Sequence, residues 1–380
     1  MNLKSSISNF LGVIQVELFP QLEEVLGPLT DKQQQLVIVL ESICIEKFVP
    51  PHFGGHGCPP KNRRAMARAF VAKAVYNMPT TRSLLDQLKS NPTLRRLCGW
   101  ERQNDIPSES TFSRAMNEFS ETDLPTRIHE ALIRTSHKAR LVGHVSRDST
   151  SIKGREKPAQ KEKAKKKPKR SRGRPKAGEK APPKEPTRLE RQVKMDSIVE
   201  MVEDLPIHCD VGTKKSSKGY KETWIGYKLH IDVADGDIPL TCLLTSASLH
   251  DSQVALPLGT ITNTRVTSCY DLMDAAYDIE AIKEHSRSMG HVPIIDVNPR
   301  RNKLLKEELQ AESKRCRKLG IKYPEDIRYN ERTGVERVNG YLKDNFGGRN
   351  VRVRGPKKVM CHLMFGILAV TATQLMRLVV

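Results

Sequence analysis

The sequence predicts an α/β protein in which a mixed β-sheet flanked by helices follows an all-helical N-terminal domain. Three observations support this fold class. Residues 1–140 carry apolar side chains at helical spacing, residues 141–152 and 196–358 alternate strand and helix signals, and a strongly basic segment at 153–195 interrupts the second part. With 380 residues, the chain is long enough to form two hydrophobic cores.

The predicted N-terminal helices have recognisable ends. Thr30 followed by Gln33 has the pattern of a capping box, which opens a helix. The inward face of this helix carries Leu36, Val37, Leu40, Ile43 and Cys44. Prolines end or limit further helices, which we expect near Arg63–Met78, Thr81–Lys89 and Leu124–Arg140.

A Gly- and Pro-rich segment follows the first of these helices. Pro51–Pro60 contains His52, His56 and Cys58, which are residue types that bind zinc, but no fourth ligand stands at a usable spacing. We therefore expect a loop, with a zinc site as the alternative.

Residues 106–119 have the outline of a helix-turn-helix. Ser108 is a good N-cap residue, and the helix that it would begin follows a turn and another helix. In one interpretation this helix contacts DNA through Ser110, Ser113 and Arg114. In the other it packs in a small bundle, and the sequence leaves both interpretations open.

The basic segment has the composition of a disordered linker. Between Lys153 and Lys194 the chain has 18 Lys or Arg, five Glu and six Pro, with few large apolar residues to form a core. Within it, Ser171–Lys176 resembles an AT-hook, whose arginines, here Arg172 and Arg174, enter the minor groove of A·T-rich DNA. A solvated basic linker is the alternative, and in either case its charge adds salt-dependent affinity for DNA.

The overall charge indicates a polyanionic partner. The formal net charge is +20, from 64 basic and 44 acidic residues, which favours nucleic acid over a basic surface without such a partner. The eight cysteines are scattered and no secretory signal begins the sequence, so we expect reduced thiols in the cytoplasm, near the nucleoid. The apolar run Val359–Val380 has His362 and Arg377 on one helical face, which favours a C-terminal packing helix at 359–380 over a membrane span.

The remaining residues predict the sheet. Asp235–Gly236 supplies a hairpin turn, and helices begin near Asp251 and Asp278. We expect strands at Leu141–Asp148, Glu222–Val233, Ile238–Ser246, Val266–Met273 and His291–Val297. The order of strands and helices implies a mixed sheet with helices on its faces.

Three carboxylates stand where a metal site would need them. Asp148 and Asp274 come where predicted strands end, so their side chains can project into a crevice. Glu336 lies on a predicted helix that shows Tyr329, Arg332 and Lys343 on the same face. A second stripe of this helix would pack on the sheet: Val335, Val338, Leu342 and Phe346.

Carboxylate oxygens are the ligands that Mg²⁺ or Mn²⁺ prefers. Two such ions, about 3.5–4 Å apart, would hold the attacking and leaving oxygens of a phosphoryl displacement. Each Asp taken singly also has an ordinary explanation as a turn or cap residue.

These residues resemble a known family. The spacing Tyr329, two residues, Arg332, three residues, Glu336, six residues, Lys343 is similar to the tail motif of one group of DDE transposases of bacterial insertion sequences. The segments around Asp148, Asp274 and His250–Asp251 are similar to further parts of these enzymes, as is the helical run Thr81–Phe119.

The resemblance implies a ribonuclease H-like core in which Asp148, Asp274 and Glu336 hold two Mg²⁺ or Mn²⁺ ions. It also implies that Arg332 and Lys343 contact DNA phosphates, whereas Tyr329 either meets the terminal nucleotide or packs. His250 and Asp251 are further candidates behind the metal ligands.

An enzyme of this family would bind the terminal inverted repeats of its element as a dimer in a synaptic complex. It would hydrolyse the DNA at each end and join the freed 3′-OH to target DNA. The alternatives are a cleavage-deficient DNA-binding protein derived from a transposase and a hydrolytic DNA nuclease of the same fold. The helical domain at 1–140 would then serve DNA-end binding or dimerisation.

Overall fold

The computed structural model describes residues 3–50, 61–138, 140–160, 185–215 and 219–378. The candidate zinc residues His52, His56 and Cys58 lie outside the described residues. The same holds for the AT-hook-like segment with Arg172 and Arg174.

The N-terminal part is helical, as predicted. The capping box at Thr30 and Gln33 is confirmed, since the Thr30 side chain accepts from the Gln33 N–H and Gln33 Oε1 accepts from the Thr30 N–H. Its helices are α1 (Leu3–Val13), α2 (Phe19–Leu26), α3 (Asp31–Ile43), α4 (Arg63–Val75), α5 (Thr81–Ser90), α6 (Pro92–Cys98), α7 (Glu109–Glu121) and α8 (Leu124–His137).

Three of these helices, α1, α2 and α6, were not individually predicted, and the reason is clear for α6. Asn91–Pro92 does end α5, but it also begins α6, because the Asn91 side chain accepts from the Leu94 N–H and Pro92 occupies the first helical position. A proline is tolerated there because its missing N–H would have no partner within the helix. The pair that was interpreted as a stop is also a start.

The second part contains a six-stranded mixed sheet. Its strands are β1 (Leu141–Lys153), β2 (Asp210–Lys215), β3 (Lys221–Ala234), β4 (Ile238–Ser246), β5 (Thr267–Met273) and β6 (Val292–Ile295). In the sheet β1 lies between β3, to which it is antiparallel, and β5, to which it is parallel. Strand β6 continues the parallel side, while β2 pairs with the first half of β3 and β4 with its second half. The predicted mixed sheet is confirmed, and β2 was missed because its sequence is mostly polar.

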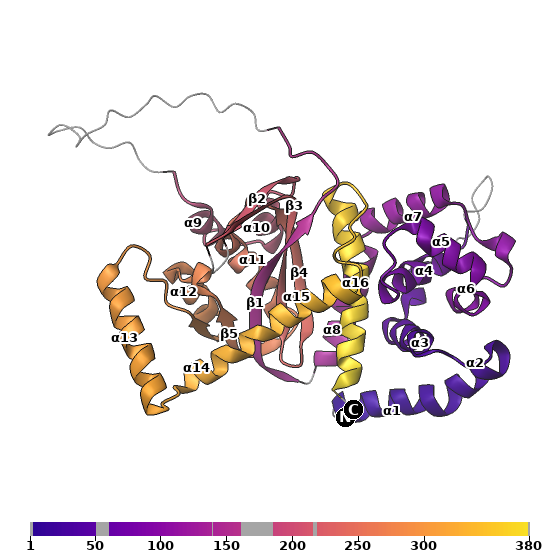
Figure 1. The fold of residues 1–380 in the computed structure, drawn as a ribbon, viewed down its shortest axis with the longest axis horizontal. Coiled ribbons are helices and arrows are strands. Elements are labelled where there is room, and N and C mark those ends of the chain that lie inside the picture. The colour runs from indigo at the N-terminus through magenta and orange to yellow at the C-terminus, as the bar shows by residue number, and fades with distance from the viewer. Residues whose placement is uncertain (1–2, 51–60, 139, 161–184, 216–218, 379–380) are drawn as a thin grey trace.

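Helices cover the sheet and extend from its parallel edge (Figure 1). They are α9 (Arg188–Gln192), α10 (Ile198–Glu203), α11 (Ala255–Asn263), α12 (Glu280–Ser288), α13 (Lys303–Leu319), α14 (Pro324–Tyr329), α15 (Thr333–Asn345) and α16 (Pro356–Arg377). The predicted stripe of α15 is confirmed, since Val335, Val338, Leu342 and Phe346 are all buried where α15 packs on β1 and β3.

The predicted limits of the basic linker need correction. Strand β1 continues to Lys153, and the Gly154 N–H still donates to the Ile225 carbonyl. At the other end, Thr187 and Glu190 form a capping box that begins α9, and Leu189 of this helix is buried. A linker reaching residue 195 is therefore wrong, because local capping and one apolar contact are enough to order residues 188–192.

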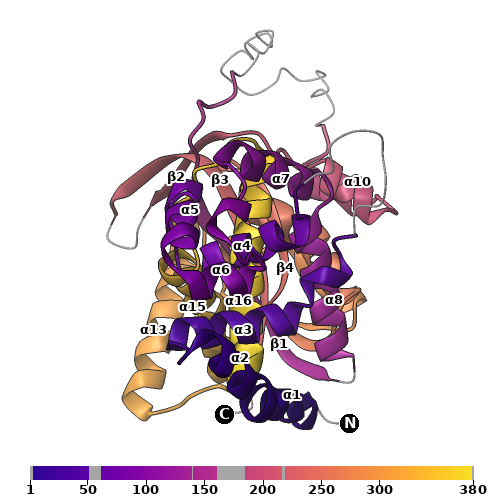
Figure 2. The ribbon, with the colours of Figure 1, turned by 90° about the vertical axis from the view of Figure 1, so that its right-hand side faces the viewer.

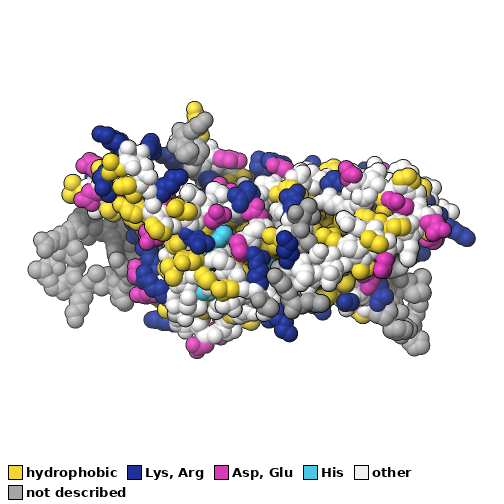
Figure 3. Space-filling view, turned by 90° about the horizontal axis from the view of Figure 1, so that it is seen from below, with side chains coloured by type: hydrophobic (Ala, Val, Ile, Leu, Met, Phe, Trp, Pro, Cys, Tyr) yellow, Lys and Arg dark blue, Asp and Glu magenta, His cyan; other side chains and the backbone are white. Residues whose placement is uncertain are grey.

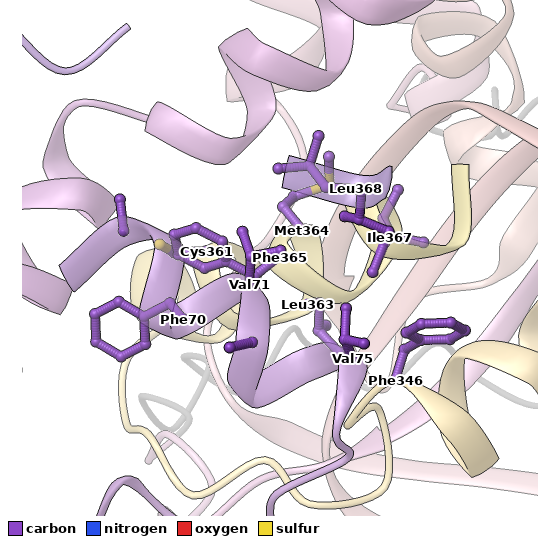
Figure 4. Close-up of a cluster of buried hydrophobic side chains, with 14 of the residues drawn as sticks. Phe70, Val71, Val75, Phe346, Cys361, Leu363, Met364, Phe365, Ile367 and Leu368 are labelled. Carbon is purple, nitrogen blue, oxygen red and sulfur yellow. The ribbon is translucent and has the colours of Figure 1, made fainter. Parts of the chain in front are cut away.

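Helix α16 joins the two parts of the chain. It packs against α3, α4, α7 and α8 on one side and against β4 and α15 on the other. In Figure 1 it stands between the sheet and the N-terminal helices, and in Figure 2 those helices lie in front of it. The close-up in Figure 4 shows side chains of α4 and α16 meeting, among them Phe70 and Phe365, whose ring centroids are 5.6 Å apart.

The burial of α16 explains its apolar sequence. By length and hydropathy this helix could cross a membrane, but 78% of its most apolar window is buried inside the protein. Its polar residues have internal partners: His362 Nε2 lies 3.2 Å from the Gly347 carbonyl, and Arg377 donates to the Tyr341 hydroxyl. The C-terminal packing helix therefore begins three residues earlier than predicted, at Pro356.

A buried ion pair fixes the centre of the sheet. Arg147 on β1 donates two hydrogen bonds to Asp232 on β3, of 2.7 and 2.8 Å, and both side chains are buried. Thr262 of α11 donates a third hydrogen bond to the Asp232 carboxylate, of 2.6 Å. This network ties the strand that carries Asp148 to its neighbour and to a covering helix.

Replacing Asp232 with Ala should destabilise the protein by about 3–5 kcal/mol, because it leaves a buried guanidinium without its partner. Urea unfolding followed by circular dichroism measures this loss. The double variant Arg147→Met with Asp232→Leu is the control, and it should recover most of the stability. Equal losses in the single and double variants would contradict the ion-pair explanation.

Candidate active site

Asp148 and Asp274 lie side by side at the edge of the parallel β1–β5 pairing. The predicted strand end at Asp148 is wrong, since β5 ends at Met273 but β1 continues to Lys153, paired there with β3 alone. The parallel register of β1 and β5 pairs Arg147 with Met273, so the two aspartates are the next residues on neighbouring strands. Adjacent strands are roughly 5 Å apart. Tertiary pairing thus brings together two carboxylates that are 126 residues apart in the sequence.

The two aspartates disfavour each other's ionisation. Burial, followed by the charges of Asp274 and Asp251, raises the pKa of Asp148 to about 6, against the 2.7 Å hydrogen bond from the Ser149 N–H. Burial and the charge of Asp251 likewise raise the pKa of Asp274, although its Oδ1 accepts from the Ala276 N–H and Arg332 lies near. A cation placed between these carboxylates would relieve the repulsion.

Asp251 adds a third acidic group to this edge. It opens a 3₁₀ turn at Asp251–Val254, and Lys228 Nζ donates to its carboxylate at 2.9 Å. Burial acts to raise its pKa, but His230 and Lys228 outweigh burial and hold the pKa of Asp251 below its ordinary value. Asp251 is thus the acidic group of this edge that already has a cationic partner.

Two histidines near these carboxylates, His250 and His230, have structural partners. His250 is exposed and caps the turn, with Nδ1 2.8 Å from the Ser252 hydroxyl. His230 is fully buried with Nε2 2.9 Å from Thr245 Oγ1, and burial lowers the pKa of His230 to about 4. A buried neutral imidazole cannot exchange protons with a DNA substrate, so His230 has a structural role here.

The single helix predicted around Glu336 is divided, because α14 ends at Tyr329, a 3₁₀ turn spans Asn330–Arg332 and α15 begins at Thr333. Glu336 lies in the first turn of α15 and is engaged by Arg332, the residue before this helix. Its Oε1 accepts from Arg332 Nη2 at 2.7 Å, and the Glu336 side chain is 53% exposed. Within the described part of the chain, no three His, Cys, Asp or Glu side chains lie close enough to hold a metal ion. The structure therefore brings two of the three predicted ligands together and leaves the third bonded to Arg332.

The rest of the tail motif lies around this carboxylate. The Arg332 guanidinium lies 5.6 Å from the centre of the Tyr329 ring. Burial, with Asp296 next to the hydroxyl, raises the pKa of Tyr329 to about 12. Lys343 Nζ donates to Thr150 Oγ1 at 2.6 Å, two residues beyond Asp148 on β1. Lys343 and the other residues of the tail motif therefore lie next to the part of β1 that contains Asp148.

The predicted DNA contacts of the N-terminal part lie on a separate surface. Ser110, Ser113 and Arg114 are exposed on α7, as either interpretation of this helix allows. Ser108 does precede the helix, but its hydroxyl lies near those of Ser110 and Thr111 rather than capping the backbone. On the underside of the molecule, basic side chains are interspersed with acidic and apolar ones (Figure 3).

Sequence reasoning missed two groups near the carboxylates. The charge of Lys214 on β2 partly offsets the rise in the pKa of both Asp148 and Asp274. Asp296 accepts a hydrogen bond from the Tyr329 hydroxyl. Neither was found because β2 was not predicted and because Asp296 follows a strand, β6, without any motif around it. The sequence Asp-Val-Gly-Thr-Lys-Lys has no run of alternating apolar residues, so it gives no strand signal of its own.

Comparisons with known proteins identify the family. The family model described as "Transposase DDE domain" matches residues 188–372, and the one described as "Transposase domain (DUF772)" matches residues 26–118. No curated protein and no solved structure matches the chain.

The two matches cover most of the N-terminal helices and most of the sheet with its helices. A DDE domain implies a ribonuclease H-like fold, which agrees with the mixed sheet described above. These enzymes generally use divalent metal ions and bind DNA. The chain belongs to the DDE transposases of the insertion-sequence type, which cleave DNA and transfer the cut strand in a metal-dependent reaction.

Proposed function

We propose that Asp148, Asp274 and Glu336 form the active site of this transposase and hold two Mg²⁺ or Mn²⁺ ions. The observation that carries the proposal is the pair of neighbouring aspartates, Asp148 within β1 and Asp274 directly after β5, each with a raised pKa. Their carboxylate oxygens suit hard divalent cations. When bound, the metal ions would activate the attacking oxygen and stabilise the leaving oxygen of the phosphodiester.

Glu336 completes the site by exchanging partners. Its side chain is more than half exposed and pairs with Arg332 only one helical turn away, so it is free to turn toward the aspartates. The exchange releases the Arg332 guanidinium, whose fork of donors matches the oxygens of a DNA phosphate. Lys343, bonded to Thr150 beside Asp148, would hold a second phosphate near the scissile bond.

Tyr329 orients Arg332 in this proposal. The ring lies against the guanidinium and its hydroxyl is tied to Asp296, so the tyrosine restricts where Arg332 can move. This role favours packing over contact with the terminal nucleotide. His250 and Asp251 act behind the ligands, by shaping the turn and by holding Lys228 beside it.

Glu336→Gln should abolish Mg²⁺-dependent cleavage and leave DNA binding within about twofold, because it removes one metal ligand and no contact to the helix core. Supercoiled plasmid carrying the element ends is incubated with Mg²⁺ and its nicking is followed on gels. The matched control is Glu331→Gln, which removes the same charge from an exposed position five residues earlier. Undiminished cleavage by Glu336→Gln would remove Glu336 from the active site.

Asp148→Asn should raise the free energy of unfolding by about 1–3 kcal/mol at pH 7 in EDTA. The sign follows from the raised pKa. In the folded protein the Asp148 carboxyl keeps its proton up to about pH 6, whereas its ordinary pKa is 3.8. The folded state therefore loses stability as the pH rises from the lower to the higher of these values. The gain should therefore disappear below about pH 4.

Thermal melts at pH 4 and pH 7, with and without about 5 mM MgCl₂, measure the pH-dependent gain in stability and the effect of Mg²⁺. Mg²⁺ should stabilise the wild type and have little effect on Asp148→Asn. Asp86→Asn, at an exposed position of α5, is the matched control and should change neither melt. A variant no more stable than the wild type at pH 7 would contradict the proposed repulsion.

We also propose that the enzyme binds the terminal inverted repeats of its element as a homodimer, with the basic linker adding DNA affinity. Deleting residues 161–184 keeps β1 and α9 intact, and it removes about a dozen positive charges between them. DNA affinity should fall, and the slope of log K against log salt should become less steep, because fewer counterions are released. Fluorescence anisotropy at several salt concentrations measures the slope, and an unchanged slope would count against the linker.

A further inference from the structure

A basic cavity lies where the N-terminal helices meet the end of β1 and the start of α16. It has a volume of about 520 Å³ and is lined by residues of α4, α5, α7 and α16, by Arg155, and by the segment before α16. Six of its lining residues are cationic: Lys73, Arg82, Arg155, Arg352, Arg354 and Lys358. In Figure 1 the upper end of α16 lies beside α7, and α5 lies next to α7.

The positive charge of this cavity is largely uncompensated. Glu109 is the acidic residue of the lining, and it pairs with Arg82 at 3.3 Å. Within the residues that the structure describes, none of the other five cations forms an ion pair. The neighbouring Lys357, by contrast, pairs with Glu121 outside the cavity.

Lys73 is the most informative member of the set. It is only 7% exposed, although it carries an ammonium group that proteins rarely bury without a partner. Burial lowers the pKa of Lys73 to about 8, which still leaves it mostly charged at neutral pH. A buried cation that lines a cavity without an anion marks a place where an anionic ligand gains binding energy.

We propose that this cavity binds the phosphodiester backbone of DNA, with Lys73 at its base and the arginines at its rim. A volume of this size takes a few sugar-phosphate units rather than a duplex, so the contact is to one strand at its backbone. The inference rests on the proposed function, since the bound DNA is the transposase's substrate.

The position of the cavity suits DNA that also occupies the active site. Asp148 and Arg155 are seven residues apart along β1 and its extension, which spans roughly 20–25 Å. B-DNA covers that distance in roughly six or seven base pairs. One duplex can therefore reach both the carboxylates and the cavity within a single helical turn.

The surface also continues toward the predicted helix-turn-helix. Ser113 and Lys358 line both the cavity and a shallower cleft that includes Arg114. The residues first singled out for DNA contact thus border the cavity. This continuity favours a DNA backbone over a free phosphate or nucleotide, which would need only the cavity itself.

The test measures binding of a fluorescent 30-bp duplex of arbitrary sequence, a length of roughly three helical turns, without Mg²⁺. Lys73→Met and the pair Arg352→Gln with Arg354→Gln should each weaken binding about tenfold. Each lost contact should lower the salt slope by about 1. Lys89→Met, an exposed lysine at the other end of α5, is the matched control and should bind normally.

Two outcomes would overturn the proposal. Variants that bind as well as Lys89→Met, with unchanged thermal melts, would exclude the cavity from DNA binding. Stabilisation of the wild type by inorganic phosphate, lost in Lys73→Met while DNA affinity stays normal, would assign the cavity to a free phosphate.

Two variants separate this inference from the proposed function. If the proposed function fails, Glu336→Gln still cleaves, whatever the cavity variants do. If only this inference fails, Glu336→Gln loses cleavage while Lys73→Met binds normally. If Lys73→Met does not fold, the double variant Arg352→Gln with Arg354→Gln, at exposed positions, still tests the proposal.

Discussion

The fold depends on burying one long apolar helix, α16, between two sets of elements. Its side chains pack on α3, α4, α7 and α8 on one side and on β4 and α15 on the other, so neither set has a complete core without it. Burial of large apolar surface is the main favourable term in folding. The N-terminal helices and the sheet are therefore held in a fixed relation by a shared core rather than by a linker.

This shared core has a consequence for DNA. The predicted arrangement of a separate helical domain followed by a catalytic core would leave the two free to move. In the structure α7, the end of β1 and the start of α16 border one basic cavity instead. A rigid junction fixes the distance between α7 and the carboxylates of the sheet, and under the proposed function this distance would set where on the DNA the cut falls.

Electrostatics divides the site into groups with partners and groups without them. Arg147 and Asp232 form a buried ion pair inside the sheet, and Lys228 forms an ion pair with Asp251 near the two aspartates. Among the residues that the structure describes, neither Asp148 nor Asp274 forms an ion pair, and both have raised pKa values. A site that keeps such repulsion at a strand edge is less stable than it could be, which is expected where carboxylates are kept for binding a ligand.

The sequence by itself determined the elements whose signals are local. The capping box at Thr30, the buried stripe of α15 and the strand end before Asp274 depend on residue type and spacing over a few positions. The predicted strand end at Asp148 was wrong, because β1 continues to Lys153. The family resemblance also rested on such short motifs. Local signals failed where a residue has two roles, as with the Asn91–Pro92 pair that both ends α5 and begins α6.

Only the tertiary structure decided which groups meet. The parallel register of β1 and β5 sets Asp148 beside Asp274, the missed strand β2 brings Lys214 near them, and the packing of α16 assembles the cavity around Lys73. These contacts join positions from 60 to more than 200 residues apart, and spacing along the chain carries no information about them. Glu336 combines both kinds of contact, because its pairing with Arg332 is local, within one helical turn, while the place of this turn beside β1 depends on how α15 packs on the sheet.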